Sequence, residues 1–150
     1  MRGGMRGAMV VLHRWCGLFI AGFLFVAGLT GAVIAWNHEL DEWANPKLYV
    51  AASGAAASAL APLELARRVE AADPRLRVSF VPLTLEQGHT AMLGVAARID
   101  PATGTPYVLG FNQLAVDPAT GQIQGRRQWG QISLSREHLL PFLYKLHYTM

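Results

Sequence analysis

An uninterrupted apolar run near the N-terminus is the feature that most constrains how this 150-residue chain can fold. Residues 16–36 read CGLFIAGFLFVAGLTGAVIAW and contain no charged side chain. A helix rises about 1.5 Å per residue, so about 20 residues cross a hydrocarbon core of about 30 Å. Trp15 and Trp36 flank the run, where aromatic rings anchor a helix at the two membrane interfaces. We therefore predict a transmembrane helix over residues 15–36.

The charges on either side of this span indicate its orientation. Three arginines and no acidic residue precede it, and three acidic residues follow it closely. The six are Arg2, Arg6, Arg14, Glu39, Asp41 and Glu42. The positive-inside rule then predicts a cytoplasmic N-terminus, residues 1–14, and a periplasmic location after the span in a bacterial inner membrane. A cleaved signal peptide is the alternative interpretation, although its apolar core would be about 7–15 residues.

The composition agrees with a membrane protein and excludes several other classes. Hydrophobic residues make up 52% of the chain and charged residues 15%, against roughly 25% in ordinary soluble domains. The net charge is only +3 and no block of five like charges occurs, so a nucleic-acid partner is not expected. The single cysteine, Cys16, excludes an intrachain disulfide framework and a cysteine-based metal site built by this chain alone.

Small residues recur four positions apart along the span, and therefore on one side of a helix. The pairs are Gly17 with Ala21, Gly28 with Ala32, and Gly31 with Ala35. They favour close packing against another transmembrane helix, because small residues let helix backbones approach in lipid. The alternative is that they reflect the ordinary composition of membrane helices.

After the span, the chain predicts a membrane-anchored α+β fold. Residues 37–61 form a helical extension, ended at Asn45-Pro46, and a linker rich in alanine. Residues 62–134 form a periplasmic domain that opens with an amphipathic helix over residues 62–72. Strands are then expected over residues 78–85, 91–99, 107–116 and 123–129, the first being an edge strand because Pro82 interrupts it. We expect Ala91, Leu93, Val95, Tyr107, Leu109 and Phe111 on the buried face.

The pentapeptide DPATG occurs twice, at residues 100–104 and 117–121. Aspartate opens a turn, proline fixes φ at the next position, and glycine permits a positive φ on leaving. Both copies therefore predict hairpin turns in an antiparallel meander. A calcium loop is disfavoured, because each copy offers a single carboxylate.

The last segment, residues 135–150, shows a helical pattern of leucines that we interpret as the start of a second membrane helix. We expect the chain to be a fragment or a truncated reading frame, because it stops inside this pattern. Among the candidate functional residues, His13 lies at the inner mouth of the span, His38 lies just past its outer end, and His147 lies on the C-terminal pattern. Each is either a half-solvated interfacial histidine or a metal or haem ligand. His89 is interpreted as a solvated turn residue.

Short motifs along the chain resemble those of a known family. The N-terminal ones are Leu12-His13-Arg14-Trp15, Gly17-Leu18, Leu29-Thr30-Gly31, Glu39-Leu40-Asp41 and Asn45-Pro46. In these motifs the chain resembles PepSY-associated transmembrane proteins, which include iron-regulated inner-membrane proteins and ferric-siderophore reductases. The central helix and meander are similar to a PepSY domain. Residues 143–147, LYKLH, resemble the leucine-histidine motif that opens the family's next membrane helix.

The resemblance implies a cofactor and a function. His13 and His147 match the family's recurring histidines, which in the reductase members hold haem iron, and His38 is a weaker candidate ligand. Haem would pass electrons across the bilayer to a ferric siderophore outside, in a complete protein with other transmembrane helices. One alternative is a membrane-tethered PepSY module that binds or regulates a peptidase or another periplasmic partner. Another is a structural or assembly subunit without chemistry.

Overall fold

The computed structural model describes residues 2–149, which form two compact units. The helical unit contains the chain up to Asn37 and the segment from Leu143 onward. The sheet unit is His38–Phe142. Met1 and Met150, the outermost residues of the predicted segments 1–14 and 135–150, lie outside the described residues.

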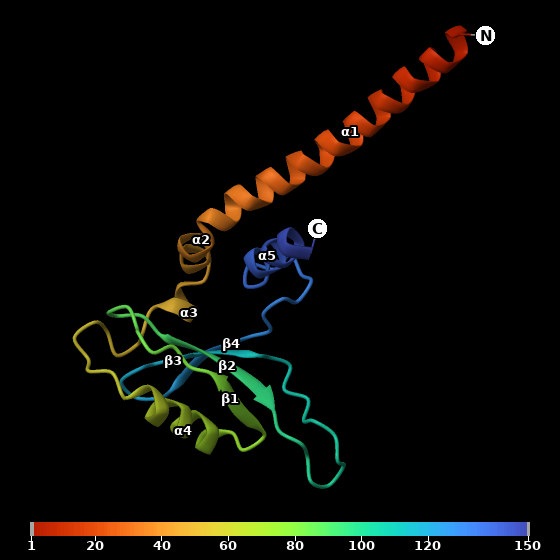
Figure 1. Ribbon diagram of the computed structural model, residues 1–150. Helices are drawn as coiled ribbons and strands as arrows, with labels where there is room; N and C mark the ends of the chain where they lie inside the picture. Colours follow the sequence, from red (N-terminus) through yellow and green to blue (C-terminus); the bar gives the residue numbers. More distant parts are fainter. Residues whose placement is uncertain (1, 150) are drawn as a thin grey trace. The chain divides into compact units, whose positions relative to one another are not determined.

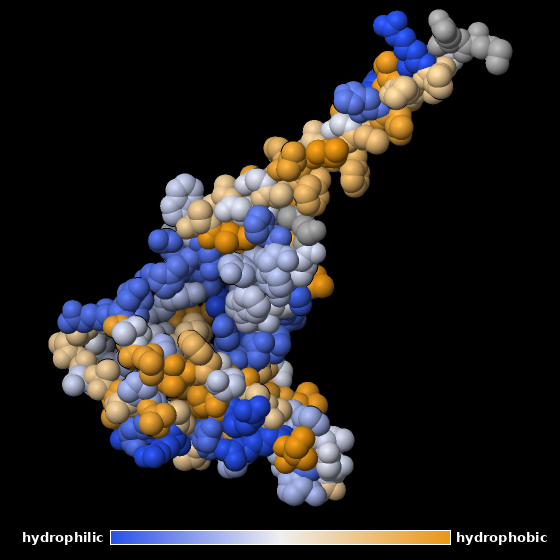
Figure 2. Space-filling view, viewed as in Figure 1, coloured by the Kyte–Doolittle hydropathy of each residue, from blue (hydrophilic) through white to orange (hydrophobic). Residues whose placement is uncertain are grey.

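Helix α1, Arg2–Ala35, dominates the helical unit (Figure 1). Its segment Gly4–Ala35 is long and apolar enough to cross a membrane. The helix extends the predicted span through most of the preceding residues 1–14. Its large apolar side chains are exposed, with Phe19 at 78% and Phe25 at 70%, and apolar side chains line the visible face of α1 in Figure 2. Such a surface suits hydrocarbon as its solvent, since exposing it to water would be unfavourable.

The prediction that this helix continues without interruption past Trp36 is wrong. A turn at Trp36, whose amide donates to the carbonyl of Val33 at 3.2 Å, separates α1 from α2, Asn37–Ala44. The break at Asn45-Pro46 is confirmed. Proline then opens a further single-turn helix, α3, Pro46–Tyr49, because its missing N–H is not needed in a first turn.

The sheet unit is an antiparallel meander with strand order β1-β2-β3-β4, as predicted (Figure 1). Its strands are β1 Leu76–Phe80, β2 Ala91–Ala97, β3 Gln113–Val116 and β4 Ile123–Arg127. Helix α4, Pro62–Ala72, has the predicted bounds and packs against the sheet. The core lies between them and is made of Leu65, Val69, Leu76, Ala91, Leu93, Val95, Leu114 and Val116.

All four observed strands differ in their bounds from the predicted ones; the second and fourth each end two residues earlier than expected, at Ala97 and Arg127. The first ends at Phe80, before Pro82, and begins two residues earlier than expected. The strand expected over residues 107–116 is formed only from Gln113 onward, because Gly110 adopts a φ of +75° and turns the chain. Leu109 and Phe111 still pack against the core from this loop, whereas Tyr107 does not belong to the core.

Both DPATG copies form the same turn, as predicted. Gly104 and Gly121 have φ values of +71° and +80°, and their amides donate to the carbonyls of Asp100 and Asp117 at 2.8 and 2.9 Å. The copies differ in burial, because Asp117 is buried and also accepts a hydrogen bond from the amide of Ser53 at 2.7 Å. Burial acts to raise the pKa of Asp117, but hydrogen bonds from nearby amides, that of Ser53 foremost, outweigh it and lower this pKa. The predicted linker is therefore anchored to the sheet unit.

The C-terminal helix α5, Leu139–Thr149, begins four residues later than expected. Residues 135–138 form a turn in which the hydroxyl of Ser135 contacts Nδ1 of His138 at 2.8 Å. Pro141 lies in the first turn of α5, where it removes no helical hydrogen bond. The 11 residues of α5 are about half the number that crosses a bilayer.

Candidate functional site

In the helical unit, the imidazole of His147 packs against α1. Its Nδ1 lies 3.0 Å from the hydroxyl oxygen of Thr30. The same oxygen lies 2.8 Å from the carbonyl oxygen of Val26 and 3.1 Å from that of Ala27, about one turn earlier. Thr30 is only 6% exposed, whereas His147 is exposed. The contact therefore holds one edge of the imidazole and leaves the other edge accessible.

Gly31 is the residue that permits this approach. A Cβ atom at Gly31 would lie 3.3 Å from Cε1 of His147 and 3.8 Å from its Nε2. The first distance is tighter than most Cβ contacts, so a larger side chain would push the imidazole away. Among the described residues, nothing lies within 4 Å of a Cβ built at Gly17 or Gly28. Of the small-residue pairs in the span, the pair with Gly31 is thus the one whose glycine meets a side chain of α5.

His13 lies near the other end of α1, with its side chain exposed. It belongs to a shallow groove on the helix. The groove is lined by Met5, Arg6, Met9, Val10 and His13. Thr30 lies seventeen positions after His13, which corresponds to about 26 Å along the helix axis. His13 and His147 are therefore too far apart to bind the same metal ion.

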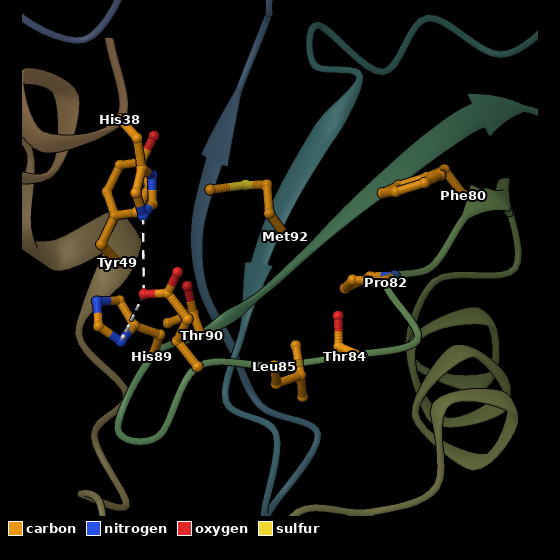
Figure 3. Close-up of a pocket in the computed structure, with 10 residues that line it drawn as sticks. His38, Tyr49, Phe80, Pro82, Thr84, Leu85, His89, Thr90 and Met92 are labelled. Atoms are coloured by element: carbon orange, nitrogen blue, oxygen red, sulfur yellow. Dashed lines mark ion pairs between the residues drawn. The ribbon is translucent and has the colours of Figure 1, made fainter. Parts of the chain in front are cut away.

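His38 belongs to the sheet unit, where it lines a pocket of about 210 Å³ (Figure 3). Its Nε2 lies 3.9 Å from a carboxylate oxygen of Glu86, and Nδ1 of His89 lies 3.7 Å from the same oxygen. Nε2 of His89 lies 3.2 Å from Glu42. The interpretation of His89 as a solvated turn residue is therefore wrong: it is partly buried and placed between two acidic side chains.

The opposite side of this pocket is apolar. It is formed by Phe80, Pro82, Leu85 and Met92 (Figure 3). Within residues 2–149, no group of three or more histidine, cysteine, aspartate or glutamate side chains is arranged to hold a metal ion. The pocket therefore offers a mixed polar and apolar surface, with His38 at its polar side.

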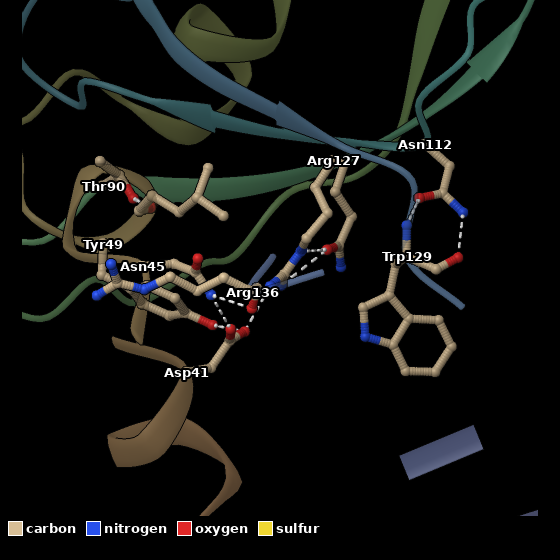
Figure 4. Close-up of polar contacts among 10 residues, drawn as sticks. Asp41, Asn45, Tyr49, Thr90, Asn112, Arg127, Trp129 and Arg136 are labelled. Atoms are coloured by element: carbon tan, nitrogen blue, oxygen red, sulfur yellow. Dashed lines mark hydrogen bonds and ion pairs between the residues drawn. The ribbon is translucent and has the colours of Figure 1, made fainter. Parts of the chain in front are cut away.

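A second group of polar side chains in the sheet unit was not anticipated from the sequence (Figure 4). Asp41 of α2 and Arg127 of β4 form an ion pair, and they are 2% and 5% exposed. The hydroxyl of Tyr49 donates to the carboxylate of Asp41 at 2.6 Å, and the side-chain amide of Asn45 donates to the same carboxylate at 2.7 Å. Arg127 also donates to the side-chain oxygen of Gln113 at 3.2 Å. Every charge in this group is satisfied, which indicates a structural role.

Two further observations describe the surroundings of this group. Burial, together with the hydrogen bond to Asp41, raises the pKa of Tyr49 to about 12. The side-chain amide of Asn45 also donates to the backbone carbonyl of Arg136 at 3.2 Å. Asn45 therefore connects the start of the sheet unit to the segment that leads into α5. No local pattern reveals this group, because Asp41 and Arg127 are 86 residues apart.

The long apolar helix and the small helix-and-meander unit define a membrane-anchored α+β protein. The family model described as the PepSY-associated TM region matches residues 10–150. The chain therefore belongs to the PepSY-associated transmembrane family, in agreement with the resemblance seen in its motifs. No curated protein matches the chain.

Proposed function

We propose that this protein takes part in haem-based electron transfer across the bacterial inner membrane, in the reduction of ferric siderophores for iron uptake. The observation that carries the proposal is the placement of His147 beside Thr30 and Gly31, with its Nε2 making no hydrogen bond to any described residue. An imidazole held at one nitrogen and open at the other has the form of an axial haem ligand.

The residues present fit such a group. His13 and His147 each present an exposed imidazole on the helical unit, and the surface beside them is mostly apolar, as a porphyrin requires. Bound haem would supply one-electron redox chemistry, and iron is released because siderophore oxygens hold ferrous iron more weakly than ferric iron. The chain's own contribution is to present two imidazoles beside exposed apolar side chains, with that of His147 held by Thr30.

The separation of about 26 Å between the levels of His13 and Thr30 along α1 favours two sites. One site near each end of the span would provide a route for electrons across the bilayer. Each histidine then needs a second ligand, which other transmembrane helices would supply. His38 is the weaker candidate ligand, since its Nε2 lies 3.9 Å from a carboxylate oxygen of Glu86.

We expect His13→Ala and His147→Ala each to remove part of the haem and leave the rest, because each would eliminate one of two separate sites. The measurement is the reduced-minus-oxidised absorption spectrum of the purified full-length protein. His89→Ala is the matched control, because it removes a histidine of the sheet unit and should leave the haem content unchanged. If both His13→Ala and His147→Ala retain the full signal, the haem proposal is wrong.

A second candidate function is a membrane-tethered module that binds a periplasmic partner, such as a peptidase. The pocket around His38 favours it, because that pocket combines histidines with apolar side chains in a unit separate from α1. Full haem retention in both histidine variants would support this candidate over electron transfer.

The proposal places the sheet unit in the periplasm. Arg6 and Arg14 precede the apolar run, whereas Glu39 and Asp41 follow it. A reporter joined after Gly54, an exposed position in a turn, is therefore expected to be active only if it functions outside the cytoplasm. A paired reporter that works only in the cytoplasm is the control, and its activity at Gly54 would reverse the orientation.

A further inference from the structure

We infer that Thr30 is a positioning residue that holds His147 in the tautomer with hydrogen on Nδ1, leaving Nε2 as a free electron-pair donor. This inference deepens the proposed function and rests on it for the identity of the ligand, which is haem iron. The placement of the proton itself follows from the contacts of one hydroxyl group.

The hydroxyl of Thr30 has one hydrogen and three close neighbours. Two of these neighbours are the carbonyl oxygens of Val26 and Ala27, at 2.8 and 3.1 Å, and neither can donate a hydrogen. The third is Nδ1 of His147, at 3.0 Å. The hydroxyl hydrogen can therefore point either toward the two carbonyls or toward Nδ1.

If the hydroxyl donated to Nδ1, its oxygen would face two carbonyl oxygens at hydrogen-bond distance with no hydrogen between them. That arrangement is repulsive, and burial of Thr30 leaves little water to relieve it. If the hydroxyl instead donates to the carbonyl of Val26, its lone pair accepts a hydrogen from Nδ1. The latter arrangement makes the contacts with Val26 and with Nδ1 attractive, and the carbonyl of Ala27 can share the same hydrogen in a three-centre bond.

A neutral imidazole carries one hydrogen on its two nitrogens, so a hydrogen on Nδ1 leaves Nε2 without one. Nε2 is then the nitrogen able to bind a metal, and it is also the one without a hydrogen bond to any described residue. Metal-binding histidines commonly donate their other N–H to an oxygen of the protein, which fixes both tautomer and ring orientation. Thr30 would do this for His147, and Gly31 leaves the space in which the ring lies.

The direct test reads the tautomer without any cofactor. Nitrogen-15 NMR of the chain in lipid bilayers, with labelled histidine, distinguishes a protonated ring nitrogen from an unprotonated one, and His147→Gln identifies the signals of His147. We expect hydrogen on Nδ1 of His147 in the unaltered chain. Thr30→Val, which has nearly the same shape but no hydroxyl, should shift the proton toward Nε2, and Thr30→Ser should restore it.

Hydrogen on Nε2 in the unaltered chain would overturn the inference, and so would a Thr30→Val variant that keeps the original tautomer. Thr30→Ser also serves as the control for helix packing, because it keeps the hydroxyl while removing a methyl group. Neither outcome depends on haem, so failure of this inference is distinct from failure of the proposed function.

The second readout uses the haem-loaded full-length protein. Loss of an outer-shell partner typically weakens metal binding about 10–100-fold, so Thr30→Val should release haem from the His147 site more readily and change its reduction potential. Thr30→Ser should behave as the unaltered protein does. If Thr30→Val leaves affinity and potential unchanged while His147→Ala loses haem, Thr30 does not position the ligand and the proposed function still holds.

Discussion

Replacement of Asp41 by alanine is expected to destabilise the sheet unit by about 3–5 kcal/mol, because it leaves the buried guanidinium of Arg127 without its counter-ion. It also removes the acceptor for the hydroxyl of Tyr49 and the amide of Asn45. The measurement is denaturant-induced unfolding of the full chain in detergent. Resistance of the sheet unit to a protease reports how much of it remains folded.

Glu39→Ala is the matched control for this change, because it removes an exposed acidic side chain from the same helix, α2. Its effect should lie within about 0.5 kcal/mol of zero. The double variant Asp41→Leu with Arg127→Met should recover much of the lost stability, since an apolar pair can replace a buried ion pair. Equal stabilities of Asp41→Ala and Glu39→Ala would contradict the role assigned to the ion pair.

Leu93→Asp is expected to abolish cooperative folding of the sheet unit. Leu93 lies on the central strand β2, is 0% exposed, and faces the core between sheet and α4. Loss of the leucine contacts alone costs about 2–5 kcal/mol, and an unpaired carboxylate in this position adds a further penalty. Amide hydrogen exchange of the full chain would measure this loss of folding, and protection should be lost throughout the four strands.

The same substitution at an exposed leucine provides the control. Leu83 is 83% exposed and lies in the loop after β1, so Leu83→Asp should leave protection of the strands unchanged. Retained protection in Leu93→Asp would mean that the buried face of the sheet has been assigned wrongly.

The sequence predicts those elements whose determinants are local. Helix α4 has its predicted bounds because a proline opens it and its apolar spacing continues to Ala72. The two DPATG turns follow from residues that fix their own backbone angles. Strand β2 shows clean alternation, because one side faces the core.

The sequence-based predictions fail where the backbone conformation depends on residues outside the local pattern. Tyr107 and Leu109 have the composition of a strand, but Gly110 turns the chain and only Gln113 onward pairs with β2. The break at Trp36 has no obvious signal, since neither proline nor glycine stands next to it.

The candidate site was predictable in part. The positions of His13 and His147 in their motifs marked them as candidates, whereas the contact of His147 with Thr30 joins residues 117 positions apart. Arg127 could not be predicted as the partner of Asp41 for the same reason. In the sequence, the charge of Asp41 served only to predict the orientation of the span in the membrane. Contacts between residues so far apart depend on the tertiary fold. The spacing of apolar residues and the composition of the chain do not reveal them.

The long separation of Asp41 from Arg127 also has a consequence for biosynthesis. A ribosome adds about 5–20 residues per second, so the 86 residues from the one after Asp41 to Arg127 take roughly 4–17 s to synthesise. During that interval Arg127 has not yet been made, so the carboxylate of Asp41 has no guanidinium to pair with. The sheet unit therefore cannot close around this ion pair before β4 has been synthesised. A nascent chain arrested before β4 would be membrane-bound but open to proteases.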